Sequence, residues 1–148
     1  MRLRVEESID NEEVEVIIKC SKNDEHIKRL IGLINTQFTN MIGKLDGENV
    51  IINLQNIYYF EAVENKVFAY ESKTVYEVPY KIQELNLLLQ DTTFIQISRT
   101  IILNVTKIQK VKPLVNGRIL AVLDNTEKVI ITRVYSYDFK ERIRKEVK

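Results

Sequence analysis

The chain has 148 residues, of which 45% are hydrophobic and 29% charged, so it can form one compact domain with a small appendage. It has no apolar run of the roughly 20 residues that a membrane helix needs, and its first residues lack the apolar stretch of a signal peptide. The single cysteine cannot form an internal disulfide, which favours a reducing, cytoplasmic location. These features exclude a membrane-spanning protein and a disulfide-stabilised secreted one.

The net charge of +1 conceals an uneven distribution along the chain. Residues 1–93 carry 10 Lys and Arg against 16 Asp and Glu, whereas residues 94–148 carry 12 against 5. The basic C-terminal third suits a polyanionic partner such as nucleic acid, and it is also compatible with an ordinary charged terminal helix.

The first 45 residues are predicted to form a β-β-α appendage, a candidate for dimerisation or regulation. Residues 2–7 are predicted as a short strand, and the alternation of apolar and polar residues over 13–20 predicts a second. A helix is expected to begin near Ser21 and to end near Gly43. Its inner face would carry the residues that recur at helical spacing: Ile27, Leu30, Ile31, Ile34, Phe38 and Met41.

The remaining residues, 46–148, are predicted to be one β-rich domain with two helices. A short helix is expected around Ile82–Leu89, and Thr132 is expected to start the last helix, with Tyr135, Phe139 and Ile143 facing inward. Asn116-Gly117 is a strong hairpin signal. The predicted class is mainly β, a β-rich α+β fold of short antiparallel sheets, with strands over 50–54, 57–63, 67–71, 75–78, 94–97, 108–115, 118–123 and 129–131.

Residues 94–108 form an apolar run that is interrupted by Arg99, Asn104 and Lys107. Burying an unpaired polar group is costly, so these side chains are expected to stand at a rim and point outward. Arg, Asn and Lys are also the side chains that read base edges and hold phosphates. The pattern therefore predicts a nucleic-acid contact, although Asn104 can instead be a turn residue that bonds its own backbone.

This run and several other landmarks, in their order along residues 48–146, resemble the LytTR DNA-binding domain family of bacterial transcription factors. The family's His is replaced here by Ser98, and Thr100 and Thr132 stand where it usually has Ser. Ser98, Thr100 and Thr132 all keep a hydroxyl. The matching landmarks are Ile57–Glu61, Val63–Val67, Ile82–Leu85, 94–108, Asn116-Gly117 and Ile131–Arg133.

The resemblance implies an elongated fold whose loops enter the major grooves of double-stranded DNA and bend it. Base contacts are expected in the turn at 64–66, in the loop after Leu103 and at the start of the last helix. Backbone contacts would set the register without reading sequence. The implied DNA-binding residues are Asn65, Lys66, Arg99, Asn104, Thr106, Lys107, Thr132 and Arg133.

Most family members carry a receiver domain, whereas only about 45 residues precede the DNA-binding region here. The expectation is a stand-alone cytoplasmic regulator that is not switched by phosphorylation of a receiver. The resemblance adds a further candidate partner, a membrane protein that restrains the regulator. A second copy of the chain is another candidate, because the apolar stripe Ile27–Met41 of so small an appendage must be buried either on the DNA-binding region or on a second subunit.

Two other functions remain open from the sequence. The first is a β-rich adaptor that binds a protein or ligand through the N-terminal helix. The second is a single-strand binder that stacks bases on the aromatic residues between 58 and 70.

Arg133 can also be a surface residue paired with Glu127, and Lys66 can be merely solvated. No catalytic motif is found, and His26 has no partner residues for a metal site, so no enzyme activity, cofactor or small-molecule substrate is expected.

Overall fold

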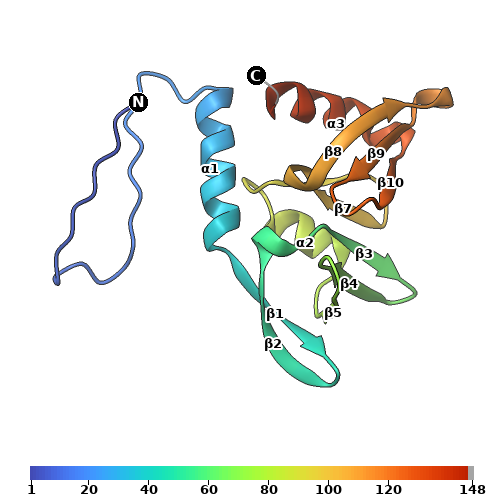
Figure 1. Cartoon of the computed structure of the whole chain (residues 1–148), viewed down its shortest axis with the longest axis horizontal. Coiled ribbons are helices and arrows are strands. Elements are labelled where there is room, and N and C mark those ends of the chain that lie inside the picture. The colour runs from blue at the N-terminus through green and yellow to red at the C-terminus, as the bar shows by residue number, and fades with distance from the viewer. Residues whose placement is uncertain (147–148) are drawn as a thin grey trace.

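A computed structural model describes residues 1–146, and a mainly β fold with antiparallel sheets is confirmed (Figure 1). The helices are α1 (Glu25–Phe38), α2 (Ile82–Leu88) and α3 (Arg133–Glu146), with short 3-10 turns η1 (Leu54–Asn56), η2 (Val105–Lys107) and η3 (Val115–Gly117). The strands are β1 (Asn40–Leu45), β2 (Glu48–Asn53), β3 (Tyr59–Val63), β4 (Lys66–Tyr70), β5 (Val75–Val78), β6 (Phe94–Gln96), β7 (Ile101–Asn104), β8 (Ile108–Pro113), β9 (Ile119–Leu123) and β10 (Lys128–Ile131).

The strands form two sheets, each with its own core. The larger sheet has the order β2-β1-β5-β4-β3-β7-β6, and the smaller has the order β10-β9-β8. Phe60 and Leu85 lie fully buried in the first core, where the larger sheet meets α2. Leu123 and Phe139 lie in the second core, where the smaller sheet packs against α3. The predicted inner face of α3 is therefore confirmed. None of the helices in residues 1–146 is long and apolar enough to span a membrane.

Helix α1 ends earlier than the sequence predicts. Asp24 caps it by accepting a hydrogen bond from the Ile27 N–H at 3.2 Å, and its last residue is Phe38. Met41, which was expected on the helix, lies in β1 instead. Every second residue of a strand points to the same face of the sheet, and Met41 is one of those that face the core, so it is buried there. Strand β1 pairs with β2 and β5, so residues 40–45 belong to the larger sheet.

The two strands predicted before α1 are not strands in the structure. Residues 1–23 form an extended segment, the N-terminal arm, whose residues are exposed except for half-buried Ile18. A turn joins its two limbs, with the Asn11 N–H donating to the Ser8 carbonyl at 3.2 Å. Apolar–polar alternation gives a segment the pattern of a strand, but a strand also needs a neighbouring strand to hydrogen-bond with. No such pairing is present for the arm within residues 1–146.

Helix α1 is fixed to the turn before β6 by buried hydroxyl groups. The Thr36 hydroxyl accepts a hydrogen bond from the Thr93 N–H at 2.9 Å and lies 3.1 Å from Thr93 Oγ1. Gly32 lies at the same contact, where a Cβ would be in ordinary van der Waals contact with the Thr92 carbonyl oxygen at 3.4 Å. Arg142 of α3 donates to the same oxygen, so the turn is held by α1 and α3 together.

The substitution Thr36→Val is expected to lower the free energy of unfolding by about 1–3 kcal/mol, because it leaves the buried Thr93 N–H without its acceptor. Urea denaturation measures the change. Thr39→Val is the matched control, because the Thr39 hydroxyl bonds only the Asn35 carbonyl within α1. Equal effects of the two substitutions would contradict a specific attachment of α1 through Thr36.

Candidate nucleic-acid interface

The turn between β3 and β4 carries two of the predicted contact residues. Glu64 adopts a left-handed conformation with φ of 51°, and Asn65 and Lys66 are exposed after it. Lys66 Nζ lies 3.7 Å from Glu77 Oε1 in a solvent-exposed ion pair. Exposed pairs of this kind contribute little stability, so DNA phosphates can compete for the lysine.

The loop between β6 and β7 lies beside this turn and presents Arg99. Ser98 is buried, and its hydroxyl accepts a hydrogen bond from the Thr100 N–H at 3.2 Å, which fixes the loop around exposed Arg99. The Thr100 carbonyl accepts from the Ala62 N–H at 2.9 Å. Because Ala62 lies near the end of β3, this bond holds the loop next to the turn at 64–66.

The start of α3 is fixed to the other side of the same loop. The Thr132 N–H donates to the Ile97 carbonyl at 3.0 Å, and the Thr132 hydroxyl donates to the same oxygen at 3.3 Å. Half-buried Thr132 therefore secures the first turn of the helix. Arg133 follows it with an exposed side chain.

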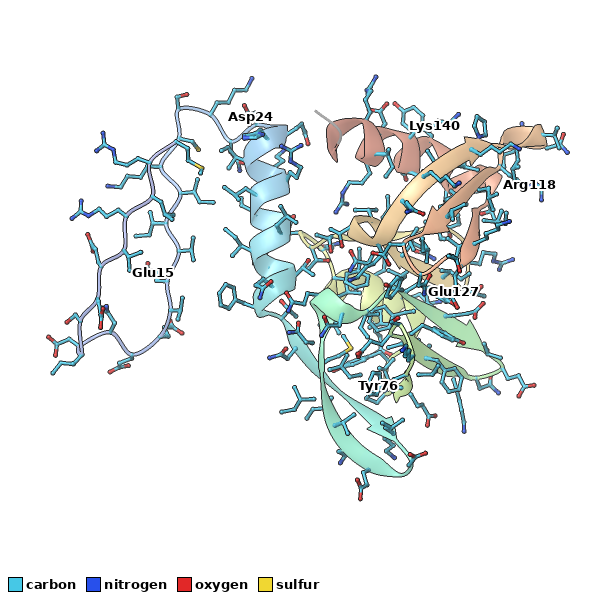
Figure 2. The ribbon with its side chains drawn as sticks, in the orientation of Figure 1. Glu15, Asp24, Tyr76, Arg118, Glu127 and Lys140 are labelled. Carbon is cyan, nitrogen blue, oxygen red and sulfur yellow. The ribbon has the colours of Figure 1, made fainter. Side chains whose placement is uncertain are left out.

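The tip between β8 and β9 completes the arrangement. A Cβ at Gly117, which has φ of 76°, would lie 3.1 Å from Arg133 Cγ, so the arginine stem runs along the glycine. The Ser136 hydroxyl donates to the Gly117 carbonyl at 2.8 Å and fixes the tip against α3. Arg118 follows with an exposed side chain (Figure 2). In Figure 1 the β3–β4 and β8–β9 tips point to the side of the molecule opposite α1 and the arm.

The structure thus groups four cationic side chains from four segments, and we call them the cationic face: Lys66, Arg99, Arg118 and Arg133. The sequence predicted three of them and missed Arg118. Arg118 directly follows the Asn116-Gly117 hairpin signal, but the sequence does not reveal that the tip of this hairpin lies against Arg133. Val134 and Tyr137, which are 85% and 73% exposed near Arg133, were also missed. The sequence could have identified them, because they do not lie on the predicted inner face of α3 and must therefore point outward.

The prediction for Asn104 is wrong, because this side chain is fully buried. Its amide nitrogen donates to the Ile57 carbonyl at 2.9 Å, and its oxygen accepts from the Thr93 hydroxyl at 2.8 Å. The oxygen also accepts from the Thr106 N–H at 3.2 Å and the Thr106 hydroxyl at 2.8 Å. The alternative of a turn residue that bonds nearby backbone is therefore the correct one.

Thr106 and Lys107 lie with Asn104 at the far end of β7 from Arg99. Thr106 bonds Asn104, and Lys107 Nζ lies 5.0 Å from the centre of the Tyr58 ring, a cation–π distance. The Lys107 carbonyl accepts from the Asp124 N–H at 2.9 Å, which places this end against the β9–β10 turn. The predicted contact residues therefore fall into two separate groups.

The aromatic residues around β3 and β4 are used inside the protein. Phe60 is fully buried, and Tyr59 and Tyr70 stack on each other with their ring centres 4.5 Å apart. Burial raises the pKa of both Tyr59 and Tyr70, and the carboxylates of Glu127 and Glu61 raise it further. Rings that stack on each other and lie beside carboxylates are a poor platform for the bases of a single strand.

Asn104→Leu is expected to lower the free energy of unfolding by about 3 kcal/mol, because it removes the partners of buried groups on three segments. Asn65→Leu is the matched control in an exposed turn, with an expected change within about 0.5 kcal/mol. Chemical denaturation of both variants measures the difference. A stable Asn104→Leu protein would contradict the structural role given to this residue.

The chain was compared with protein families, curated proteins and solved structures. A family model described as "LytTr DNA-binding domain" matches residues 47–144. The sensory transduction protein LytT of Enterococcus faecalis (strain ATCC 700802 / V583) is 32% identical over 89 residues, which are 60% of this chain and 37% of LytT. A Staphylococcus aureus (strain N315) protein named as an uncharacterized HTH-type transcriptional regulator is 26% identical over 145 residues, 97% of this chain and 98% of that protein.

The fold has a solved counterpart in a LytTr DNA-binding domain from Bacillus cereus. The two superpose with a TM-score of 0.67 at 24% identity, over 71% of this chain and 96% of the other. At this sequence identity the structural similarity shows a shared fold, whereas the family model matches the amino-acid sequence itself. Since the family model covers more than half of the chain, the protein belongs to the LytTr DNA-binding domain family.

Proposed function

We propose that this protein is a transcriptional regulator that binds double-stranded DNA in a sequence-specific manner, with the cationic face placed against the major groove. The single observation that carries this proposal is the grouping of Lys66, Arg99, Arg118 and Arg133 on one side of a domain of a DNA-binding family. Four cations drawn from four segments provide the charge that phosphate binding requires.

Arg133 is proposed as the base-reading residue of this face. Its guanidinium can donate two hydrogen bonds to guanine O6 and N7 in the major groove. The stem lies along Gly117, and the bonds of Thr132 to Ile97 hold the helix start, so the side chain has a supported position. Exposed Val134, the next residue, and exposed Tyr137, one turn further along α3, can add apolar contacts, for example with a thymine methyl group.

Asn65, Lys66, Arg99 and Arg118 are proposed as contacts that set the position of the duplex, with Thr132 supporting the helix start. Lys66 and Arg99 lie on neighbouring loops joined by the Ala62–Thr100 hydrogen bond, so they can meet adjacent phosphates. Thr106 and Lys107 lie at the other end of β7 and are weaker candidates, because Lys107 is half-buried against Tyr58.

The adaptor function is less well supported than DNA binding. The inner side of α1, with Gly32 and Thr36, is used to attach the helix to the DNA-binding domain.

We further propose that the protein acts in the cytoplasm without enzyme activity. Residues 1–45 are proposed as a dimerisation or regulatory element whose last strand, β1, joins the larger sheet of the DNA-binding region 46–148. A second copy and a restraining membrane protein remain the proposed protein partners.

Arg133→Ala is expected to cost about 1–3 kcal/mol on the cognate site and to relax the preference at one base pair, since a paired hydrogen bond to a base edge is lost. Selection of bound duplexes from a random pool first supplies the cognate site. Binding is then measured on every single-base-pair variant of that site.

Arg144→Ala is the matched control for this prediction. It removes an exposed arginine from the other end of α3, where Arg144 lies 2.6 Å from Glu141. The control is expected to leave base preference unchanged. A loss for Arg133→Ala that is uniform over all sequences would make Arg133 a phosphate contact, and no loss would remove it from the interface.

The salt dependence of binding separates Lys66 from Lys107. Lys66→Ala is expected to reduce the slope of log affinity against log salt by about 1, because one phosphate contact and its counterion release are lost. Lys107→Ala is expected to leave the slope unchanged. Titrations of the full chain with duplex DNA at several salt concentrations provide the slopes, and the reverse ranking would place the DNA at the other end of β7.

A further inference from the structure

We propose that two copies of this chain associate through the N-terminal arm, by antiparallel pairing of residues 12–22 of one copy with the same residues of the other. The pairing is centred on Ile17. This inference deepens the homodimer part of the proposed function, and it does not require DNA. It identifies an interaction surface on the side of the molecule away from the cationic face (Figure 1).

The first reason is that the arm is an extended segment without a strand partner. None of the backbone groups of residues 12–20 forms a backbone hydrogen bond within residues 1–146. The two limbs of the arm are linked near the turn, where the Asn11 side chain donates to the Glu6 carbonyl at 3.4 Å. An unpaired extended segment with alternating apolar residues is a template for pairing with another strand.

The second reason is the apolar surface that the arm leaves uncovered. Val14, Val16 and Ile17 are 79%, 53% and 69% exposed. On the neighbouring helix, Leu33 and Phe38 are 44% and 66% exposed. Between the arm and α1 lies a hollow of about 340 Å³. Apart from Asn35 its lining is apolar: Val14, Val16, Ile18, Ile31, Ile34 and Phe38.

A second strand laid beside residues 12–22 would cover this surface. Even-numbered residues of an extended segment share one face, so Val14, Val16 and Ile18 of the second copy would lie next to the same residues of the first. The paired strands would then rest on the apolar side of α1 from each copy. Burying exposed apolar surface in this way is the main driving force of association.

The charge order of the segment selects a second copy as its partner. Acidic Glu12, Glu13 and Glu15 precede basic Lys19 and Lys22. In antiparallel pairing centred on Ile17, each Glu15 lies opposite a Lys19 and each Glu12 opposite a Lys22. A parallel arrangement would place like charges together. Opposite charges in cross-strand pairs stabilise a sheet, and like charges destabilise it.

The same register also matches the apolar residues. Val16 of one copy lies opposite Ile18 of the other, and Val14 lies opposite Cys20. Each pair occurs twice because the two strands are related by a two-fold axis through Ile17. An interface that repeats the same patch on both subunits is the usual arrangement of a homodimer.

A charge exchange tests this register in the full chain without DNA. Glu15→Lys and Lys19→Glu are each expected to raise the dimer dissociation constant about tenfold, since each places like charges opposite one another twice. The double variant Glu15→Lys, Lys19→Glu is expected to restore association. Residues 15 and 19 of one strand are roughly 13 Å apart, so restoration cannot come from a pair within one chain.

Analytical ultracentrifugation over a range of protein concentrations measures these constants. Glu48→Lys, an exposed acidic residue of β2, is the matched control and is expected to leave association unchanged. A wild-type chain that stays monomeric throughout the range overturns the proposal. A double variant that is weaker than both single variants overturns the register.

A cysteine pair tests the same register by a second route. Val14→Cys is expected to form a covalent dimer with the native Cys20 of the second copy under a mild disulfide-forming oxidant such as diamide, because directly opposite residues have Cβ atoms about 5 Å apart. Val14→Cys combined with Cys20→Ser is expected to form much less covalent dimer, since residue 14 of one copy does not lie opposite residue 14 of the other. Equal yields contradict the proposal. Because both tests omit DNA, the arm interface and the DNA-binding proposal can fail independently.

Discussion

The buried amide of Asn104 and the hydroxyl groups around it form the constraint on which the domain depends. Through Thr93 the amide is connected to Thr36 of α1, through Ile57 to the start of β3, and through Thr106 to η2. All these groups are paired, so burial in a medium of low dielectric strengthens the network instead of penalising it. A network of this kind fixes register, because shifting one of these segments relative to the others leaves a buried polar group without a partner.

The fixed register also determines what each end of β7 presents. Asn104 holds one end to the core, and at the other end the loop with Arg99 is tied to β3 and to α3. Four cations therefore meet on one side of the domain although they are far apart in the sequence. The N-terminal arm lies on the opposite side of the molecule (Figure 1).

The sequence predicted the fold class, most strands of the domain and the inner face of α3, because apolar periodicity reports burial directly. It failed at Asn104, where a polar residue in an apolar run was expected to point outward. That rule holds only for unpaired groups, and partners such as Ile57 and Thr93 become neighbours only after folding. Met41 continued the helical spacing by coincidence. The alternation over 13–20 indicated a strand but could not reveal that its partner is absent from the described chain.

The central claim is that the cationic face meets the duplex through the start of α3 and the neighbouring loops. The most direct measurement is the change in backbone amide NMR shifts when the full chain binds a duplex selected from a random pool. The largest changes are expected at 64–66, 98–100, 116–118 and 132–134, with small changes at 104–107. The largest changes at 104–107 or along α1 would contradict this claim.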